Sequence, residues 1–228
     1  MRSMRLIVAL GMTAGLMLAA ACSSPTLAPP SVSLIVGSGA TRIETRAVSN
    51  FTRIAVYGPG EVNLVQDGAE ALTIEAEDNV LPLLTSDVRD GRLVLGTERG
   101  IVIRPTQPIR YTLSARQVTG LEMNGGGFIR ASNLHTDVLR VTVNGGTRVR
   151  LDGSVDRQDI VIAGASDYHA EQLVSREANV EINGAGTVVL NVSAHLIATI
   201  NGAGTVEYIG SPRVERSING LGSVRPRS

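Results

Sequence analysis

The sequence predicts an all-β protein whose strands wind into a solenoid with coils of about 18–20 residues. The main observation is a recurring corner motif. Its order is an aliphatic residue, any residue, a second aliphatic residue, Asn, Gly and then a small residue. The Asn positions of its six copies, with Ala163 in the third, are 124, 144, 163, 183, 201 and 219. The intervals of 20, 19, 20, 18 and 18 residues are too short for a propeller blade or a helical repeat, both over about 30 residues. Such even spacing favours stacked β coils.

Alternation and composition support strands between these corners. In residues 180–182, Val-Glu-Ile, the aliphatic side chains point to one side and the acid to the other, as the two-residue period of a strand requires. Val188, Leu190 and Val192 continue the inward side after the corner. Aromatic residues make up 3% of the chain, Trp is absent and Gly reaches 25. Tight turns with small aliphatic side chains between them therefore fit better than a core built on aromatic anchors.

The Asn-Gly step of each corner has a physical reason. A sharp corner needs positive φ, which Gly adopts freely and Asn tolerates. Stacked coils place equivalent residues about 4.8 Å apart, where identical Asn side chains can form a hydrogen-bonded ladder. The predicted corner positions are Asn124, Gly125, Asn144, Gly145, Gly164, Asn183, Gly184, Asn201, Gly202, Asn219 and Gly220. An alternative is that each Asn-Gly forms an isolated hairpin turn, but the regular period favours the solenoid.

The part of the chain before these repeats is less regular. We assign residues 118–224 to the regular repeats, residues 41–117 to an N-terminal β segment and residues 225–228 to a short polar tail. Five runs in the N-terminal segment have strand character: residues 51–57, 62–66, 72–76, 93–95 and 109–113. Residues 79–86 lack alternation and fit one or two helical turns. We expect this segment to form the first coils or a capping sheet, because solenoid ends must be blunted.

The N-terminal residues have the pattern of an export signal. Arg2 and Arg5 precede an apolar run over residues 6–21, which is shorter than the roughly 20 residues of a comfortable bilayer span. Small residues lead directly into Cys22, the only cysteine. This junction resembles the lipobox of bacterial lipoproteins, so residues 1–21 are predicted to be a signal peptide and Cys22 the lipid-attachment site. The alternative is ordinary cleavage after Ala-x-Ala, which would leave Cys22 as a free thiol.

Lipidation of Cys22 would place the protein in the cell envelope. Several acyl chains on one cysteine hold a protein on a membrane stably, so the membrane is its first predicted partner. Residues 22–40 are rich in Ser, Pro, Ala and Gly, and we interpret them as the lipidated cysteine and a flexible tether. Ser23 and Ser24 follow the cysteine without an Asp, which resembles Gram-negative sorting patterns for the outer membrane. We therefore expect an exported, lipid-anchored protein of the outer membrane.

With these motifs, the chain resembles the putative auto-transporter adhesin head GIN domain family. The matching positions are Phe51, Ile54 and Val56, then Val62, Leu64, Gln66 and Gly68, then Asp90-Gly91 with Leu93, and the later Asn-Gly-x-Gly copies. The resemblance covers about residues 48–224. It implies a right-handed parallel β-helix in secreted or lipid-anchored bacterial proteins. It implies no established activity, because fold does not fix function.

The sequence offers few groups for catalysis or metal binding. His135, His169 and His195 are far apart in the chain, and none has a second ligand at a metal-binding spacing, so no metal or cofactor is predicted. No Lys follows the Gly-rich corners, which excludes a P-loop. Both charge signs are spread along a chain with a formal net charge of +0, so nucleic acid is not an expected partner.

One cluster gathers an acid, an imidazole and a second acid within five residues. On a strand, Asp167, His169 and Glu171 would share one face, which is the arrangement that acid–base chemistry would need. The other interpretation is that the repeat bulges into a loop beside the degenerate corner at residues 163–166. Such a loop would favour contact with a partner rather than chemistry. We take these residues as the candidate binding site and predict no catalytic residue.

The function that best fits these features is non-catalytic. We expect an envelope lipoprotein that presents a rigid β-helical domain for adhesion-like binding or a structural role, with an unknown envelope protein or polysaccharide as partner. Arg148 and Arg150 are predicted on one exposed face near Arg130, where they could bind an anionic polymer. The alternative is a carbohydrate-active β-helix enzyme acting on an envelope or extracellular polysaccharide. A third interpretation is an accessory subunit of an envelope-stress or signalling system.

Overall fold

The computed structural model describes residues 32–227. The predicted signal peptide, Cys22 and the first part of the predicted tether therefore lie outside the described residues. Within residues 32–227 the chain is built of strands, and its one helical element is the short 3₁₀ turn η1 (Leu81–Leu83). This turn falls where the sequence predicted one or two helical turns, and the all-β prediction is confirmed. The described residues contain no helix of the length and apolar character needed to span a membrane.

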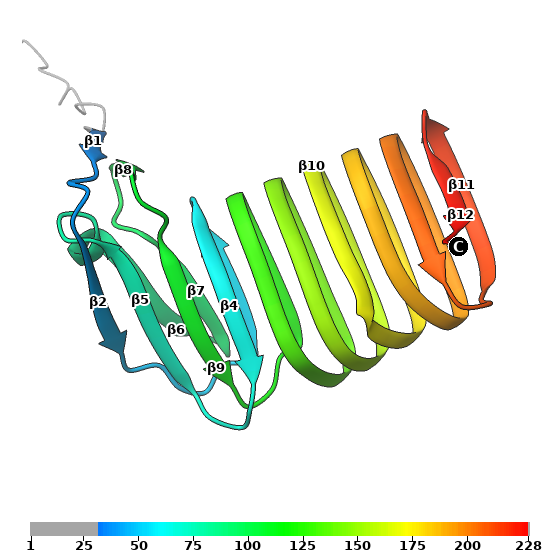
Figure 1. The fold of residues 1–228 in the computed structure, drawn as a ribbon, viewed down its shortest axis with the longest axis horizontal. Helices are drawn as coiled ribbons and strands as arrows, with labels where there is room; N and C mark the ends of the chain where they lie inside the picture. The colour runs from blue at the N-terminus through cyan, green and yellow to red at the C-terminus, as the bar shows by residue number, and fades with distance from the viewer. Residues whose placement is uncertain (1–31, 228) are drawn as a thin grey trace, which may run out of the picture. The chain divides into compact units, whose positions relative to one another are not determined.

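The first half of the described chain folds into short strands around the start of the core. The strands are β1 (Ser33–Val36), β2 (Thr41–Arg46), β3 (Arg53–Tyr57), β4 (Gly60–Gln66), β5 (Ala71–Glu77), β6 (Leu84–Arg89), β7 (Arg92–Thr97), β8 (Ile101–Arg104) and β9 (Arg110–Ala115). Strands β2, β5, β9 and β4 lie side by side in that order (Figure 1). The β2–β5 and β5–β9 pairs are antiparallel, whereas β9 pairs with β4 in parallel. On the other side of the core, β6 pairs antiparallel with β7, and β7 pairs in parallel with β3.

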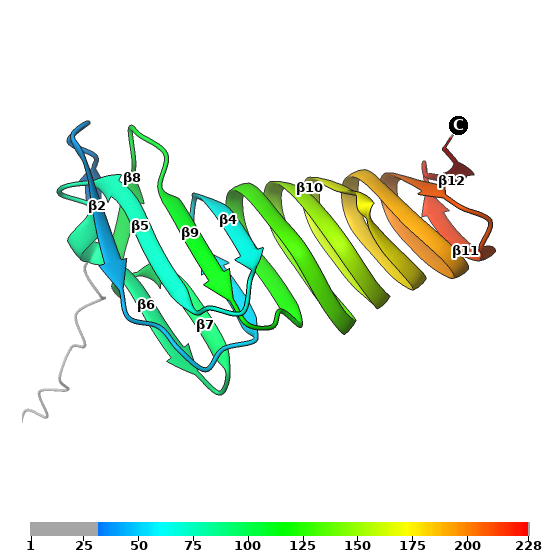
Figure 2. The same cartoon turned by 60° about the horizontal axis from the view of Figure 1, so that its bottom comes forward.

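The second half is dominated by β10 (Gly120–Ile209), one ribbon that winds back on itself repeatedly (Figures 1 and 2). We call each circuit of this ribbon a winding. The start of β10 pairs in parallel with β3 and β4, and its end pairs in parallel with β11 (Arg213–Gly220) and β12 (Ser223–Pro226). In the β10–β11 register, Asn219 pairs with Asn201, 18 positions earlier. Equivalent residues of the repeat therefore lie next to each other on neighbouring windings.

Small aliphatic side chains fill the interior of the windings. Val180 and Ile182 before a corner, and Val188, Leu190 and Val192 after it, are at most 1% exposed. The side chain between the first two, Glu181, is exposed. Each fully buried aliphatic side chain stabilises the fold by about 1.5–3 kcal/mol relative to an exposed one. The aliphatic side chains therefore point inward and the acid points outward, as the alternation in the sequence predicted.

The segment before the repeats supplies both features expected of it. Strands β3 and β4 pair in parallel with the start of β10 and so continue the stack, whereas β2 and β5 are antiparallel and cover its N-terminal end. Phe51, just before β3, is 1% exposed and belongs to the same core as the aliphatic residues of the windings. The open end of the core at this side is therefore closed by the chain itself.

Glu77, the last residue of β5, is a buried carboxylate that joins three segments. Its oxygens accept hydrogen bonds from the backbone N–H of Gly39 at 2.7 Å, from the backbone N–H of Thr106 at 2.9 Å and from the Thr106 hydroxyl. The Thr106 hydroxyl contributes most to lowering the pKa of Glu77, against the opposing effect of desolvation. The ionised Glu77 therefore holds the connections before β2 and after β8 against β5.

Two predicted boundaries need correction. The tether was expected over residues 22–40, but Ser33–Val36 forms β1, which pairs in parallel with β8. Aliphatic and β-branched residues in this stretch, Leu-Ile-Val, have the high strand propensity that overrides its Ser- and Pro-rich surroundings. At the other end, the predicted tail at residues 225–228 is partly ordered, since β12 includes Pro226 and the N–H of Arg227 donates to the carbonyl of Tyr208 at 2.8 Å.

Candidate functional site

The glycines of the corner motif form a stacked column. Gly145 has φ +138°, and a Cβ there would lie 2.1 Å from the carbonyl oxygen of Gly125 on the preceding winding. Gly202 has φ +149°, and its Cβ would lie 2.2 Å from the carbonyl oxygen of Gly184. Gly164 of the degenerate copy belongs to the same column and lies against Gly145. Only glycine fits a position that combines this backbone conformation with so close a contact.

The asparagines beside these glycines hydrogen-bond to one another along the stack. Three side-chain bonds run from Nδ2 to Oδ1: Asn144 to Asn124 at 2.8 Å, Asn201 to Asn183 at 2.9 Å and Asn219 to Asn201 at 3.0 Å. Ala163 lies between Asn144 and Asn183 and interrupts the ladder. The corner residues therefore hold neighbouring windings together, which is a structural role.

Asn201→Ala is expected to lower the free energy of unfolding by about 1 kcal/mol, because Asn201 both donates to and accepts from a neighbouring asparagine. The cost stays modest because the freed partners are exposed and can bind water. The matched control is Asn179→Ala on the same surface, since Asn179 is exposed and has no side-chain hydrogen bond within residues 32–227. Urea denaturation followed by circular dichroism measures both. Equal stability of the two variants would contradict a stabilising ladder.

Beyond the third corner, the structure places Asp167, His169 and Glu171 on one outward face of β10. Tyr168 and Ala170 between them are fully buried, so the acid, the imidazole and the second acid alternate with core residues. The alternative of a bulged loop is wrong, because residues 163–171 stay in strand conformation. The corner also keeps its place in the stack although Ala163 replaces asparagine, because Gly164 still provides the positive φ of 126°.

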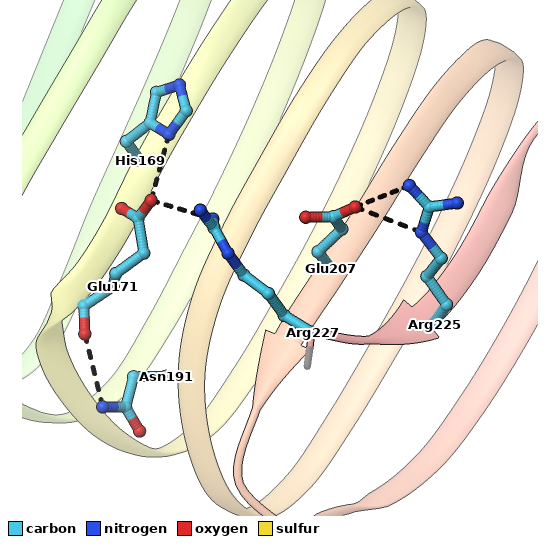
Figure 3. Close-up of polar contacts among 6 residues, drawn as sticks. All are labelled: His169, Glu171, Asn191, Glu207, Arg225 and Arg227. Atoms are coloured by element: carbon cyan, nitrogen blue, oxygen red, sulfur yellow. Dashed lines mark hydrogen bonds and ion pairs between the residues drawn. The ribbon is translucent and has the colours of Figure 1, made fainter.

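Glu171 is held in a small polar network (Figure 3). Its Oε1 lies 3.3 Å from Nδ1 of His169 and accepts a hydrogen bond from Nη1 of Arg227 at 3.0 Å. Its backbone carbonyl accepts a hydrogen bond from Nδ2 of Asn191 at 3.3 Å. Desolvation opposes ionisation of Glu171, but its own backbone N–H, His169 and Arg227 together outweigh that effect and lower the pKa. Glu171 is therefore an ionised hydrogen-bond acceptor, not a carboxylic acid ready to give up a proton.

Two arginines near the C-terminus connect β12 to earlier windings. Arg225 donates from Nη2 and Nε to Oε1 of Glu207 at 2.7 and 3.1 Å, beside the contact between Arg227 and Glu171 (Figure 3). Arg225 and Glu207 are partners in the β10–β12 register, so this contact links adjacent windings. Exposed ion pairs contribute up to about 1 kcal/mol each, and these two add moderately to the backbone pairing of β12.

Two shallow depressions lie beside each other on this outward face. The first has a volume of about 380 Å³ and is lined by Arg130, Arg150, Asp152, His169 and Glu171, among others. The second has a volume of about 330 Å³, and its lining includes Phe128, Arg148 and Asp167. Each depression crosses the same three windings. We call these eight residues together the arginine face.

The arginines of this face have no ion-pair partner. Arg130, Arg148 and Arg150 are exposed, and none of them forms a salt bridge within residues 32–227, where most other arginines do. The guanidinium of Arg130 lies 5.8 Å from the ring centroid of Phe128. Arg130 and Arg150 occupy equivalent positions on neighbouring windings, about 4.8 Å apart, so these two like charges lie close together, and the carboxylates of the same face form no salt bridge with them within residues 32–227. This arrangement is suited to binding an anion.

The three histidines do not meet. His169 lines the depression with Arg130 and Arg150, whereas His135 and His195 each line a different depression. His195 also lies 3.3 Å from a carboxylate oxygen of Glu215 on the next winding. Over residues 32–227, no three His, Cys, Asp or Glu side chains are arranged to hold a metal ion. His169 is therefore the one histidine among the residues that line the two depressions of the arginine face.

A buried polar chain behind the arginine face was not predicted. The Tyr168 hydroxyl donates to Oε1 of Gln158 at 2.8 Å, and Nε2 of Gln158 donates to Oγ of Ser175 at 3.0 Å. The Ser175 hydroxyl in turn donates to the carbonyl of Asn191 at 2.9 Å. Desolvation raises the pKa of Tyr168, so its hydroxyl stays protonated as the donor. The sequence does not indicate that Gln158 is buried, because its neighbours Asp156, Arg157 and Asp159 are charged and are typical of a solvated turn.

Comparisons with known proteins support the fold and identify the family. No curated protein gives a significant match. The structure of a putative adhesin from Bacteroides fragilis is similar with a TM-score of 0.67 and 21% identity, covering 85% of this chain and 100% of that chain, so the fold is shared. A putative adhesin from Parabacteroides merdae gives a TM-score of 0.46 and 19% identity, covering 86% and 99%. A putative lipid binding protein from Parabacteroides distasonis gives 0.46 and 18%, covering 86% and 100%. The family described as "Putative auto-transporter adhesin, head GIN domain" matches residues 50–212, and the chain belongs to this family.

Proposed function

We propose that the protein is a non-catalytic envelope lipoprotein that presents a right-handed parallel β-helix for adhesion-like binding. The parallel register of 18 residues between β10 and β11 and the stacked corner glycines support a β-helix. Membership of the family described as "Putative auto-transporter adhesin, head GIN domain", and the fold shared with a putative adhesin, support the binding role. The observation that carries the proposal is the arginine face, where rigid strands hold three exposed arginines that form no salt bridge within residues 32–227.

The binding role is tested by retention on envelope polymers. The purified protein is passed over immobilised lipopolysaccharide, peptidoglycan and capsular polysaccharide, and the same polymers are assayed for cleavage. We expect retention on at least one polymer, weakened in Asp167→Ala, His169→Ala or Glu171→Ala variants that remain folded. Absence of retention on all of them would contradict adhesion-like binding to an envelope polymer. Turnover of any polymer that is lost in His169→Ala would replace this proposal with the carbohydrate-active enzyme.

Cys22→Ser is expected to leave the protein exported but to release it from the membrane. The physical reason is that the proposed acyl chains on Cys22 are its anchor, and each buried CH₂ group contributes about 0.8 kcal/mol to membrane binding. Membrane and soluble fractions are compared by immunoblot, and intact mass is measured on the mature wild-type protein. A wild-type N-terminus without added lipid mass would refute lipid attachment at this cysteine and leave ordinary cleavage.

A further inference from the structure

The arginine face combines unpaired cations with ionised hydrogen-bond acceptors. We propose that it binds a linear polysaccharide whose sugars carry carboxylates, with the arginines on the carboxylates and Asp152, Asp167 and Glu171 on the sugar hydroxyls. This inference rests on the proposed binding function and deepens it by naming the chemical class of the ligand. It is carried by the composition of the face, by its placement across successive windings and by the absence of internal ion pairs for its arginines.

The cations select an anion with a planar, two-oxygen group. Arg130 and Arg150 line the same depression, and Arg148 lies two residues from Arg150 on the outward side of the same strand. Guanidinium groups this close repel one another, and an anion between them relieves that repulsion. The rigid fork of a guanidinium matches a carboxylate through two parallel hydrogen bonds, which gives geometric selectivity as well as attraction.

The acids of the face select a ligand that also donates hydrogen bonds. Asp152, Asp167 and Glu171 line the two depressions with the arginines, and an ionised carboxylate can only accept. The lowered pKa of Glu171 and its contacts with His169 and Arg227 keep it ionised and in place. A polyphosphate chain offers anionic oxygens without donors, so it could not form hydrogen bonds with these acids. An acidic sugar supplies carboxylates for the arginines and hydroxyl donors for the acids.

The geometry of the face fits an extended chain. The first depression is lined from three successive windings, by Arg130 on one, Arg150 and Asp152 on the next and His169 and Glu171 on the third. Neighbouring windings are about 4.8 Å apart, close to the length of one pyranose residue. Half-buried Phe128 beside Arg130 adds an apolar surface on which the C–H face of a sugar ring can pack. A linear polymer lying across the windings can therefore place successive sugars over successive windings.

The test uses galacturonate oligomers and their methyl esters, which share a sugar chain and differ in charge. Binding to the purified protein is measured by isothermal titration calorimetry at low and high salt. The variant Arg148→Gln/Arg150→Gln is compared with Arg42→Gln/Arg104→Gln, which removes the same charge from two exposed arginines without ion pairs elsewhere in residues 32–227. We expect wild type to bind the acid form at least about tenfold more tightly than the ester, and salt to weaken this binding. Arg148→Gln/Arg150→Gln should bind the acid form at least about tenfold more weakly than wild type, whereas Arg42→Gln/Arg104→Gln should bind it as wild type does. Circular dichroism confirms that both variants are folded.

Three results would overturn this ligand class. They are equal binding of acid and ester, equal weakening in the two double variants, and binding of inorganic polyphosphate or phosphatidylglycerol vesicles in preference to the acidic sugar. The envelope-polymer assay separates this failure from that of the proposed function. If Arg148→Gln/Arg150→Gln is retained on envelope polymers as well as wild type, the carboxylated ligand is refuted while adhesion-like binding stands. If wild type is not retained at all, both fall.

Discussion

Gly145→Ala is expected to lower the free energy of unfolding by roughly 3 kcal/mol or more, whereas Gly146→Ala next to it is expected to leave stability unchanged or raise it by up to about 1 kcal/mol. At Gly145 the added Cβ would lie 2.1 Å from the Gly125 carbonyl oxygen, and the backbone has φ +138°. At Gly146 the Cβ would meet only the Ala165 carbonyl oxygen at 3.8 Å, an ordinary contact, and the backbone is not in the positive-φ region.

These adjacent substitutions add the same methyl group and differ only in position within the corner. Urea denaturation of both variants and wild type gives the difference directly. Gly202→Val, with φ +149° and a clash at 2.2 Å against Gly184, should be at least as destabilising as Gly145→Ala, because a β-branched side chain adds bulk to the same conflict. A Gly145→Ala protein as stable as Gly146→Ala would show that neighbouring windings do not stack as closely as the structure has them.

Tyr168→Ala is expected to cost about 3–5 kcal/mol, and Tyr168→Phe about 1–3 kcal/mol. Tyr168 is fully buried, so alanine leaves a large cavity inside the windings. Phenylalanine keeps the volume but leaves Oε1 of Gln158, a fully buried side chain, without the donor 2.8 Å away. The matched control is Tyr57→Phe, because Tyr57 is 44% exposed and its hydroxyl can be replaced by water.

A double-mutant cycle separates the hydrogen bond from its surroundings. Combining Tyr168→Phe with Gln158→Leu removes both partners, so the double variant should be less destabilised than the sum of the two single variants. Denaturant midpoints, read from circular dichroism, provide all four stabilities. Strict additivity of the two substitutions, or a Tyr168→Phe protein as stable as wild type, would argue against a satisfied polar chain in this core.

The corner positions could be predicted because they leave a local mark in the sequence. Positive φ and close stacking both require glycine at Gly145 and Gly202, and the ladder favours asparagine beside them, so a regular interval is visible. The interval also located Gly164 in a copy that lacks asparagine. The outward direction of Asp167, His169 and Glu171 followed from the two-residue period of a strand alone.

Other features could not be predicted because they depend on contacts distant in the chain. The antiparallel cap requires β2 to pair with β5 and β5 with β9, and alternation within each strand does not specify its neighbour. The strand β1 is short, and its partner β8 lies more than sixty residues further on, at Ile101–Arg104. Arg130, Arg148 and Arg150 are candidates for ligand binding because they form no salt bridge within residues 32–227. Which arginines lack a salt bridge follows from the three-dimensional arrangement and not from the sequence.

The register between windings also has a consequence for how family members can vary. Because each winding packs mainly on the ones before and after it, a unit of 18–20 residues can be inserted or deleted without a new kind of contact. A unit added on the N-terminal side of Arg130 would move the arginine face one step of about 4.8 Å away from the capping strands. A unit added after Arg227 would leave that distance unchanged. The number of repeats thus sets the distance between a binding surface and the capping strands, in steps of one winding, without changing the residues of that surface.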